Sequence, residues 1–207
     1  NVGFGCLVYV MWLTSDPGQD ETYTSILYCS KAKVTPKVTT TPWAELAGLV
    51  LLVCLLKKVL PNIDKRPARL TLFGDSTCTI ASMQMNVQGM RPFFANRVLE
   101  VVTHLKGMGC EADREVTQEL TLEERLDQEA DTKIDLIQPI AGISNPADVP
   151  SRGSIEWADM GLNSTYQKGP DFIRQPRPTW EEIITRDFVK RLLEEEIKKQ
   201  FHNVMMI

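Results

Sequence analysis

The chain has 207 residues, 43% of them hydrophobic, which is enough for one domain of ordinary size with an extension. Its five cysteines form no CxxC pair, which indicates reduced thiols in a cytosolic or nuclear setting and argues against a disulfide framework or a zinc site. The longest apolar run, residues 46–56, is too short to cross a bilayer, so we expect no membrane partner.

The net charge of −4 speaks against a nucleic-acid partner, but the charge is unevenly distributed. Residues 111–131 contain nine acidic residues and two arginines, a local charge of −7, which leaves +3 for the rest of the chain. A modestly basic remainder is compatible with phosphate binding. The chain opens on strand-like sequence without an initiating Met or a targeting signal, so we expect a piece of a longer protein.

The N-terminal region predicts a β-meander. Residues 2–13 are apolar on both alternating faces, as in a strand inside a sheet that is covered on two sides. Turn residues follow at 16–20, and residues 23–34 alternate as expected for an antiparallel neighbour. Residues 34–40 could add a third strand.

Helices and strands alternate in the rest of the chain. Thr41 and Pro42 provide an N-cap and a first-turn residue for a helix over about 43–60, which ends at Pro61. The later predicted elements are, in order, a buried strand at 68–76, helices over 76–85 and 91–105, a strand at 133–140, a helix from Asn145, a proline-rich surface segment at 169–182 and an amphipathic helix over about 180–201.

This order of elements predicts an α/β fold with a mixed central sheet and helices on both faces. We assign residues 1–160 to one domain with an acidic insertion at about 111–131. Residues 161–207 are assigned to a C-terminal extension or linker that carries the amphipathic helix.

Glu45 is the first candidate functional residue. We expect it in the first turn of an otherwise apolar helix, where Leu49 and Leu52 are its neighbours one and two turns on. An ionised group on a packed face is costly unless it is paired or ligated. A capping-box glutamate is the structural alternative, but with Thr41 as N-cap the third helical position is Ala44.

Asp75 and Asp148 are two further candidates, and each has a simple structural alternative. Asp75 ends a buried strand, and either it or Ser76 can cap the next helix. With Asn145 as N-cap and Pro146 first, Asp148 is the third helical residue, where the helix dipole stabilises a carboxylate by about 0.3–1 kcal/mol.

Considered together, the three acids indicate a metal site. One lies at a helix start, one at the end of a central strand and one at the start of the last helix, so all can meet at one end of a sheet. Hard oxygen ligands without a nearby histidine or thiolate favour Mg²⁺, with Mn²⁺ as an alternative. Two such ions about 4 Å apart activate a water and stabilise the leaving oxygen in phosphodiester cleavage.

Several strings resemble one known family. They are "SKAKV", "TPWAELAGL", "LFGDSTCTI", "FFANRVLEV" and "AGISNPADVPSRG", followed by "GPDFI". In combination they resemble the ribonuclease H domain in the polyproteins of BEL/Pao-type LTR retrotransposons, from residue 1 to about 183. The resemblance implies an RNase H-like fold, hydrolysis of the RNA strand of RNA/DNA hybrids, two Mg²⁺ ions, and a place between the reverse transcriptase and integrase regions of one polyprotein. It also implies a cytoplasmic retroelement particle or the nucleus as the location.

Position by position, the resemblance assigns Glu45, Asp75 and Asp148 to the second, third and fourth acids of the family's four-carboxylate site, as catalytic residues and metal ligands. In the family, the first aspartate lies in the opening strand, in an Asp-Ala-Ser-like string just before the segment that residues 1–10 match, so we expect this chain to lack the start of that strand. We therefore expect weak or no cleavage by this chain, because that aspartate bridges both ions in the family. The long acidic segment and "PIAG" at 139–142 are further departures.

Substrate contacts are harder to assign. Ser76, Asn96, Arg97 and Arg152 lie in the matching strings, and such side chains contact phosphate or the ribose 2′-OH in other proteins. The structural alternatives are a polar helix face for Asn96 and solvated surface charges for the arginines.

Two other functions are considered. The first is a catalytically inactive RNase H-like structural or interaction module, decayed or domesticated, which the acidic segment and the low basicity favour. The second is an integrase, but integrase-type sites use two aspartates and then a glutamate, whereas the order here is Glu45, Asp75, Asp148.

Overall fold

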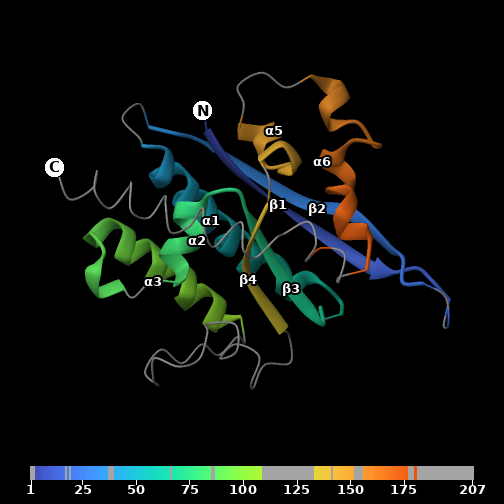
Figure 1. Cartoon of the computed structure of the whole chain (residues 1–207), viewed down its shortest axis with the longest axis horizontal. Helices are drawn as coiled ribbons and strands as arrows, with labels where there is room; N and C mark the ends of the chain where they lie inside the picture. Colours follow the sequence, from blue (N-terminus) through green and yellow to red (C-terminus); the bar gives the residue numbers. More distant parts are fainter. Residues whose placement is uncertain are drawn as a thin grey trace.

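The structure is a computed structural model, and it describes residues 3–16, 18, 20–36, 40–65, 67–84, 87–108, 133–140, 142–151, 156–176 and 180. The acidic segment at 111–131 and nearly all of the expected C-terminal helix lie outside this described part. The α/β fold class is confirmed, with helices on both sides of the strands (Figure 1).

The N-terminal meander forms as predicted. Strand β1 (Gly3–Leu13) pairs antiparallel with β2 (Tyr23–Val34), and the register shifts between Val8 and Tyr9. Strand β2 ends at Val34, and neither Thr35 nor Pro36, the next two residues, belongs to a strand.

Helix α1 (Thr41–Val59) is the central element of the core. It begins earlier than expected, because Thr40 rather than Thr41 is the N-cap and Pro42 lies in the first turn. The helix packs on β1 and on α3 (Pro92–Gly107). The core side chains between these elements include Leu46, Val53 and Val98, all exposed by 1% or less. An almost wholly apolar helix is buried on several sides, as its sequence requires.

A second pair of strands continues the fold. Strand β3 (Arg69–Gly74) pairs parallel with β4 (Lys133–Pro139), and α2 (Thr77–Gln84) follows β3. Among the described residues the four strands form two separate two-stranded sheets, β1–β2 and β3–β4, where we had expected one central sheet. The mixture of antiparallel and parallel pairing is nevertheless as predicted.

Two helices approach β1 from opposite faces, and a glycine of β1 makes room for one of them. A Cβ on Gly5 would lie 3.0 Å from Cγ of Pro150 in α5 (Asp148–Ser151), and a Cβ on Gly48 of α1 would lie 3.9 Å from Cβ of Phe4. Because successive strand residues point to opposite faces, α1 and α5 cover the two sides of β1. The two helices that carry Glu45 and Asp148 are thus both held against one strand.

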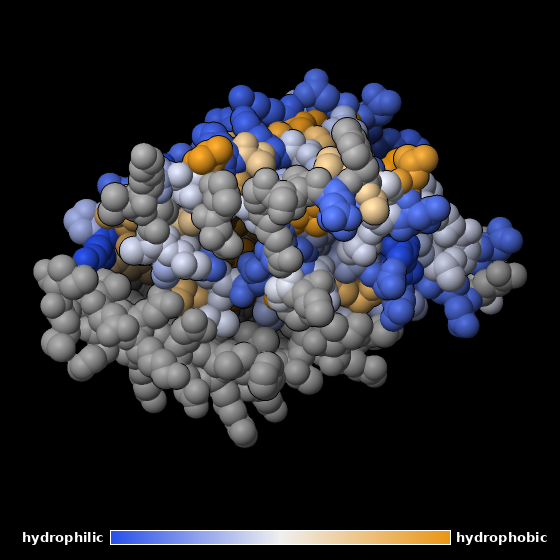
Figure 2. All heavy atoms as spheres, turned by 90° about the horizontal axis from the view of Figure 1, so that it is seen from above, coloured by the Kyte–Doolittle hydropathy of each residue, from blue (hydrophilic) through white to orange (hydrophobic). Residues whose placement is uncertain are grey.

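The segment after α5 packs on the β1–β2 sheet through α6 (Thr165–Lys168). The Tyr166 hydroxyl lies 2.8 Å from the Ser30 hydroxyl, and the Tyr9 hydroxyl donates to the Tyr166 carbonyl at 2.8 Å. Short 3₁₀ turns occur at Leu60–Asn62, Val87–Gly89, Gly142–Ser144, Trp157–Met160 and Asp171–Arg174. Among the coloured residues of the face in Figure 2, hydrophobic side chains are scattered between hydrophilic ones.

Candidate functional site

One large cavity brings the predicted carboxylates together. It has a volume of about 880 Å³ and is lined along β1 and along β3, so it lies between the two sheets. Glu45, Asp75 and Asp148 all line it, together with Ser76. Three acids from three distant parts of the sequence therefore face the same space.

Glu45 does not cap its helix. Because α1 begins at Thr41 after the N-cap Thr40, no acidic residue lies in the first turn, and our placement of Glu45 in that turn was wrong. A capping box requires the glutamate at the third helical position, which Trp43 occupies. Glu45 is half-buried, and the capping-box role that was the structural alternative does not apply to it.

Asp75 is also relieved of the capping role. The Ser76 hydroxyl accepts a hydrogen bond from the Thr79 backbone N–H at 3.1 Å, and the Ile80 N–H donates to the Ser76 carbonyl at 3.1 Å. Ser76 is thus the N-cap of α2. Asp75 is exposed directly after β3, and a Cβ added to Gly142 would lie 3.7 Å from its Oδ2.

Asp148 lies where a turn becomes a helix. We expected the helix to start after Asn145, but residues 146 and 147 form a turn, so Asp148 is the first helical residue rather than the third. The Asn145 side chain accepts from the Ala147 N–H at 3.1 Å, which ends the preceding loop. Asp148 is half-buried, and the close approach of α5 to Gly5 fixes its position beside β1.

The wall that β1 contributes is electrically neutral around pH 7. Burial, together with the neighbouring Cys29, raises the pKa of the Cys6 thiol to about 12, and burial also raises the pKa of the Tyr9 hydroxyl. Both residues line the cavity. The charged side chains that line the cavity come from outside β1, and they are Glu45, Lys65, Arg69, Asp75 and Asp148.

The donor set suits Mg²⁺ in kind, because carboxylate oxygens are the ligands that this ion prefers. The three acids are less compact than a closed site. Among the described residues, three ligating atoms within 4.8 Å of one another occur at Cys54, Glu100 and His104 and not at the carboxylates. Binding at Glu45, Asp75 and Asp148 would thus draw their side chains closer together.

A comparison with known families found one match, to the N-terminal part of the chain. Residues 1–76 match the model of the Pao retrotransposon-like RNaseH-like domain. The N-terminal region is therefore similar to this family. The match covers β1, β2, α1 and β3, and it includes both Glu45 and Asp75. No curated protein and no solved structure matches the chain significantly.

The residues expected to contact the substrate differ in their exposure and in their partners. Asn96 is exposed on α3, and Ser76 is buried with its hydroxyl engaged as a cap. Arg97 is no isolated surface charge, because its Nη1 lies 2.6 Å from Oε2 of Glu100 and its Cζ lies 5.8 Å from the centre of the Phe93 ring. Arg152 lies outside the described residues. Contact of these side chains with a substrate stays a prediction.

Sequence reasoning missed an aromatic row beside the start of α1. Trp43 stacks on Phe93 with ring centres 5.5 Å apart, and Phe4 meets Trp43 edge-on at 6.3 Å. All three rings are half-buried. Because Trp43 precedes Glu45 by two residues and Arg97 covers Phe93, the row ties α3 to the carboxylate end of α1. The residues were visible in the sequence, but their pairing depends on tertiary contacts.

Proposed function

We propose that this chain is the RNase H-type nuclease domain of a retroelement polyprotein, which hydrolyses the RNA strand of RNA/DNA hybrids formed in reverse transcription. The observation that carries the proposal is that Glu45, Asp75 and Asp148 line one cavity. Neither Glu45 nor Asp75 has the capping role that would have explained it otherwise. The family of residues 1–76 supports the same function.

In this proposal the three carboxylates hold two Mg²⁺ ions, or Mn²⁺ in their place. The ions supply the charge that activates a water and stabilises the leaving oxygen at the scissile phosphate. The chain's own residues set the geometry. The exposed Asp75 projects from the end of β3, while the half-buried Glu45 and Asp148 approach from helices on opposite faces of β1.

We further propose that the three acids alone give weak cleavage. The cavity extends along both β1 and β3. It therefore lies where a further strand between the two sheets would be. A strand placed there would carry its side chains past the carboxylate end, where a fourth acid would complete the set. The proposed partners are such a strand, the hybrid substrate, and the reverse transcriptase and integrase regions of the polyprotein. The proposed location is a cytoplasmic retroelement particle or the nucleus.

One observation favours a second candidate, an RNase H-like module without catalytic activity. The ligating atoms of Cys54, Glu100 and His104 all lie within 4.8 Å of one another, and the carboxylate oxygens of Glu45, Asp75 and Asp148 do not. A module of this kind would serve in assembly or interaction. No helix in the described part of the chain is both long and apolar enough to cross a membrane.

The test is cleavage of a hybrid with a labelled RNA strand in the presence of Mg²⁺. The chain is compared with a version that carries any residues its gene encodes upstream of Asn1, each with Asp75→Asn as the control. The nuclease proposal expects Mg²⁺-dependent cutting that is stronger in the longer protein and abolished by Asp75→Asn. If neither protein cuts while both are folded by circular dichroism, the proposal fails and the inactive module replaces it.

A further inference from the structure

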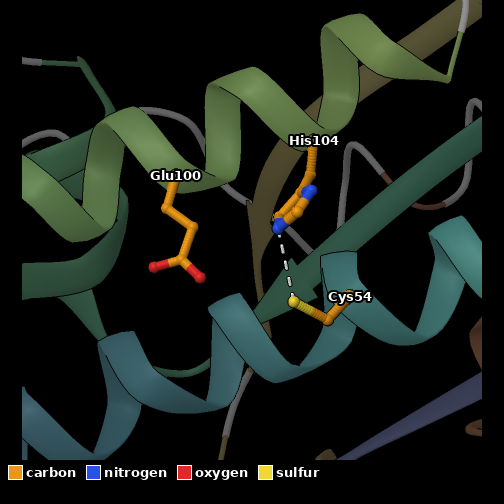
Figure 3. Close-up of side chains that lie close together, drawn as sticks. All are labelled: Cys54, Glu100 and His104. Atoms are coloured by element: carbon orange, nitrogen blue, oxygen red, sulfur yellow. Dashed lines mark hydrogen bonds between the residues drawn. The ribbon is translucent and has the colours of Figure 1, made fainter.

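A second group of metal-ligating side chains lies between α1 and α3. Cys54 comes from α1, and Glu100 and His104 lie one turn apart on the same face of α3 (Figure 3). Their ligating atoms all lie within 4.8 Å of one another. We call these three residues the α1–α3 cluster. None of them lines the cavity of the carboxylates.

The spacing of two of the ligands fits a shared ion. Sγ of Cys54 lies 3.4 Å from Nε2 of His104, in a hydrogen bond that Figure 3 marks. Two ligands on a tetrahedral zinc, with Zn–S of about 2.3 Å and Zn–N of about 2.0–2.1 Å, lie roughly 3.5 Å from each other. The thiol and the imidazole are therefore already at the separation that one zinc ion would impose on them.

Glu100 supplies the third ligand from a supported position. Its carboxylate points toward α1 (Figure 3), and Arg97 Nη1 contacts its Oε2 at 2.6 Å. A carboxylate has two oxygens, so ligation of an ion through one oxygen is compatible with this ion pair. Outer partners of this kind orient metal ligands in known sites.

The helices that carry the cluster are held rigidly by the core. Val53, beside Cys54, and Val101, beside Glu100, are both fully buried, and Leu105, beside His104, is 2% exposed. Each ligand thus neighbours an anchored residue, while the three ligands themselves are half-buried and accessible to an ion. A site on two packed helices needs little rearrangement to bind.

We propose that the α1–α3 cluster binds one zinc ion through Cys54, Glu100 and His104, with a water as the fourth ligand. A thiolate and an imidazole favour Zn²⁺ or Co²⁺ over Mg²⁺, so this site is chemically distinct from the carboxylates in the cavity. On binding, the Cys54 thiol loses its proton to solvent, and the ion bridges α1 to α3. The inference does not depend on the proposed nuclease function.

The sequence argued against a zinc site because it has no CxxC pair. That reasoning covers sites built from paired cysteines. Here a single cysteine meets a glutamate and a histidine four residues apart on another helix, and the pairing becomes visible only when the two helices are packed together.

The test uses the purified full chain with Zn²⁺ alone, titrated against a chromophoric chelator, and a parallel titration with Co²⁺. We expect one Zn²⁺ per chain and, with Co²⁺, the absorption of a tetrahedral ion with a thiolate-to-cobalt charge-transfer band. Cys54→Ser and His104→Gln should each weaken Zn²⁺ binding by more than about 100-fold, beyond the ~10–100-fold that loss of an outer partner produces. Glu100→Gln should weaken it less, because the remaining thiolate and imidazole are the stronger ligands.

Cys29→Ser is the matched control, because Cys29 is another half-buried cysteine outside the cluster. It should leave the affinity and the cobalt spectrum unchanged. The proposal is overturned if the folded chain binds no Zn²⁺. It is equally overturned if Cys54→Ser keeps full affinity and the charge-transfer band, which would place the ion elsewhere in the chain. Circular dichroism of every variant separates loss of the site from loss of the fold.

Discussion

Two polar groups share helix α1, and they differ in how they are built. Glu45 lies near the start of the helix, and Cys54 follows nine residues later, about 13 Å further along its axis. The three carboxylates come from α1, from the end of β3 and from the start of α5. The α1–α3 cluster comes from two packed helices. The first group is spread around a cavity and the second is compact.

This difference has a physical cause. Three carboxylates repel one another, so they stay apart until cations compensate their charge. A thiol, an imidazole and one carboxylate paired with Arg97 carry little net charge, so they can lie close together without an ion. The difference in compactness is therefore the one that the charges of the two groups predict in the absence of a metal.

The largest expected effect separates the two groups. In the protein that carries any residues encoded upstream of Asn1, Asp75→Asn should reduce Mg²⁺-dependent cleavage of a hybrid by about 100-fold or more, because several kcal/mol of charge stabilisation are lost. The same variant should keep the cobalt spectrum of the α1–α3 cluster. Cys54→Ser should remove the thiolate-to-cobalt band of the α1–α3 cluster and keep the cleavage of the hybrid. Equal loss of cleavage and of cobalt binding in both variants would show that the groups are not independent.

The shared helix gives the next effect. Leu56 is 2% exposed within the core that α1 forms, so Leu56→Ala should lower the free energy of unfolding by about 2–5 kcal/mol. Urea denaturation measures this. Leu162→Ala is the control, because Leu162 is 86% exposed and its loss should change stability by less than ~0.5 kcal/mol. Similar values for the two variants would contradict the core described here.

A smaller effect concerns the end of the cavity. Ser76→Ala removes the side-chain cap of α2 and should lower the free energy of unfolding by about 1 kcal/mol. Ser82→Ala is the matched control, since the Ser82 hydroxyl donates back to the Cys78 carbonyl within the helix and caps nothing. If Ser76→Ala leaves stability unchanged but weakens hybrid binding, Ser76 contacts the substrate as the resemblance implies.

The smallest expected effect is on the pH dependence of stability, and it comes from the buried thiol of Cys6. Its pKa is raised to about 12 in the folded chain, so the folded state holds its proton more tightly than the unfolded state does. Its contribution to stability is complete below the unfolded pKa, near 9, and is lost as the pH rises toward 12. Chemical denaturation between pH 8 and pH 11 should show a shallower alkaline loss for Cys6→Ala than for the unsubstituted chain.

The sequence predicted the elements of this fold well because their patterns are local. The period-2 alternation of residues 23–34 predicted β2 to the residue, and the prolines at 42 and 61 bounded α1 closely. The errors are at helix starts. At Thr40 and Asp148 several capping residues stand side by side, and local chemistry alone does not choose among them.

The candidate site was predictable in its members but not in its surroundings. The acids stood out because charges next to buried segments require an explanation. The separation of the sheets, the aromatic row at Trp43 and the α1–α3 cluster all depend on contacts between segments that are distant in sequence. No periodicity encodes such contacts.

Metal binding by the three carboxylates is tested most sharply by anomalous diffraction from crystals grown with Mn²⁺, which binds oxygen ligands as Mg²⁺ does. The protein should carry any residues encoded upstream of Asn1. We expect anomalous peaks bounded by Glu45, Asp75 and Asp148. Well-ordered carboxylates without a peak between them, at a Mn²⁺ concentration that supports cleavage in related nucleases, would contradict it.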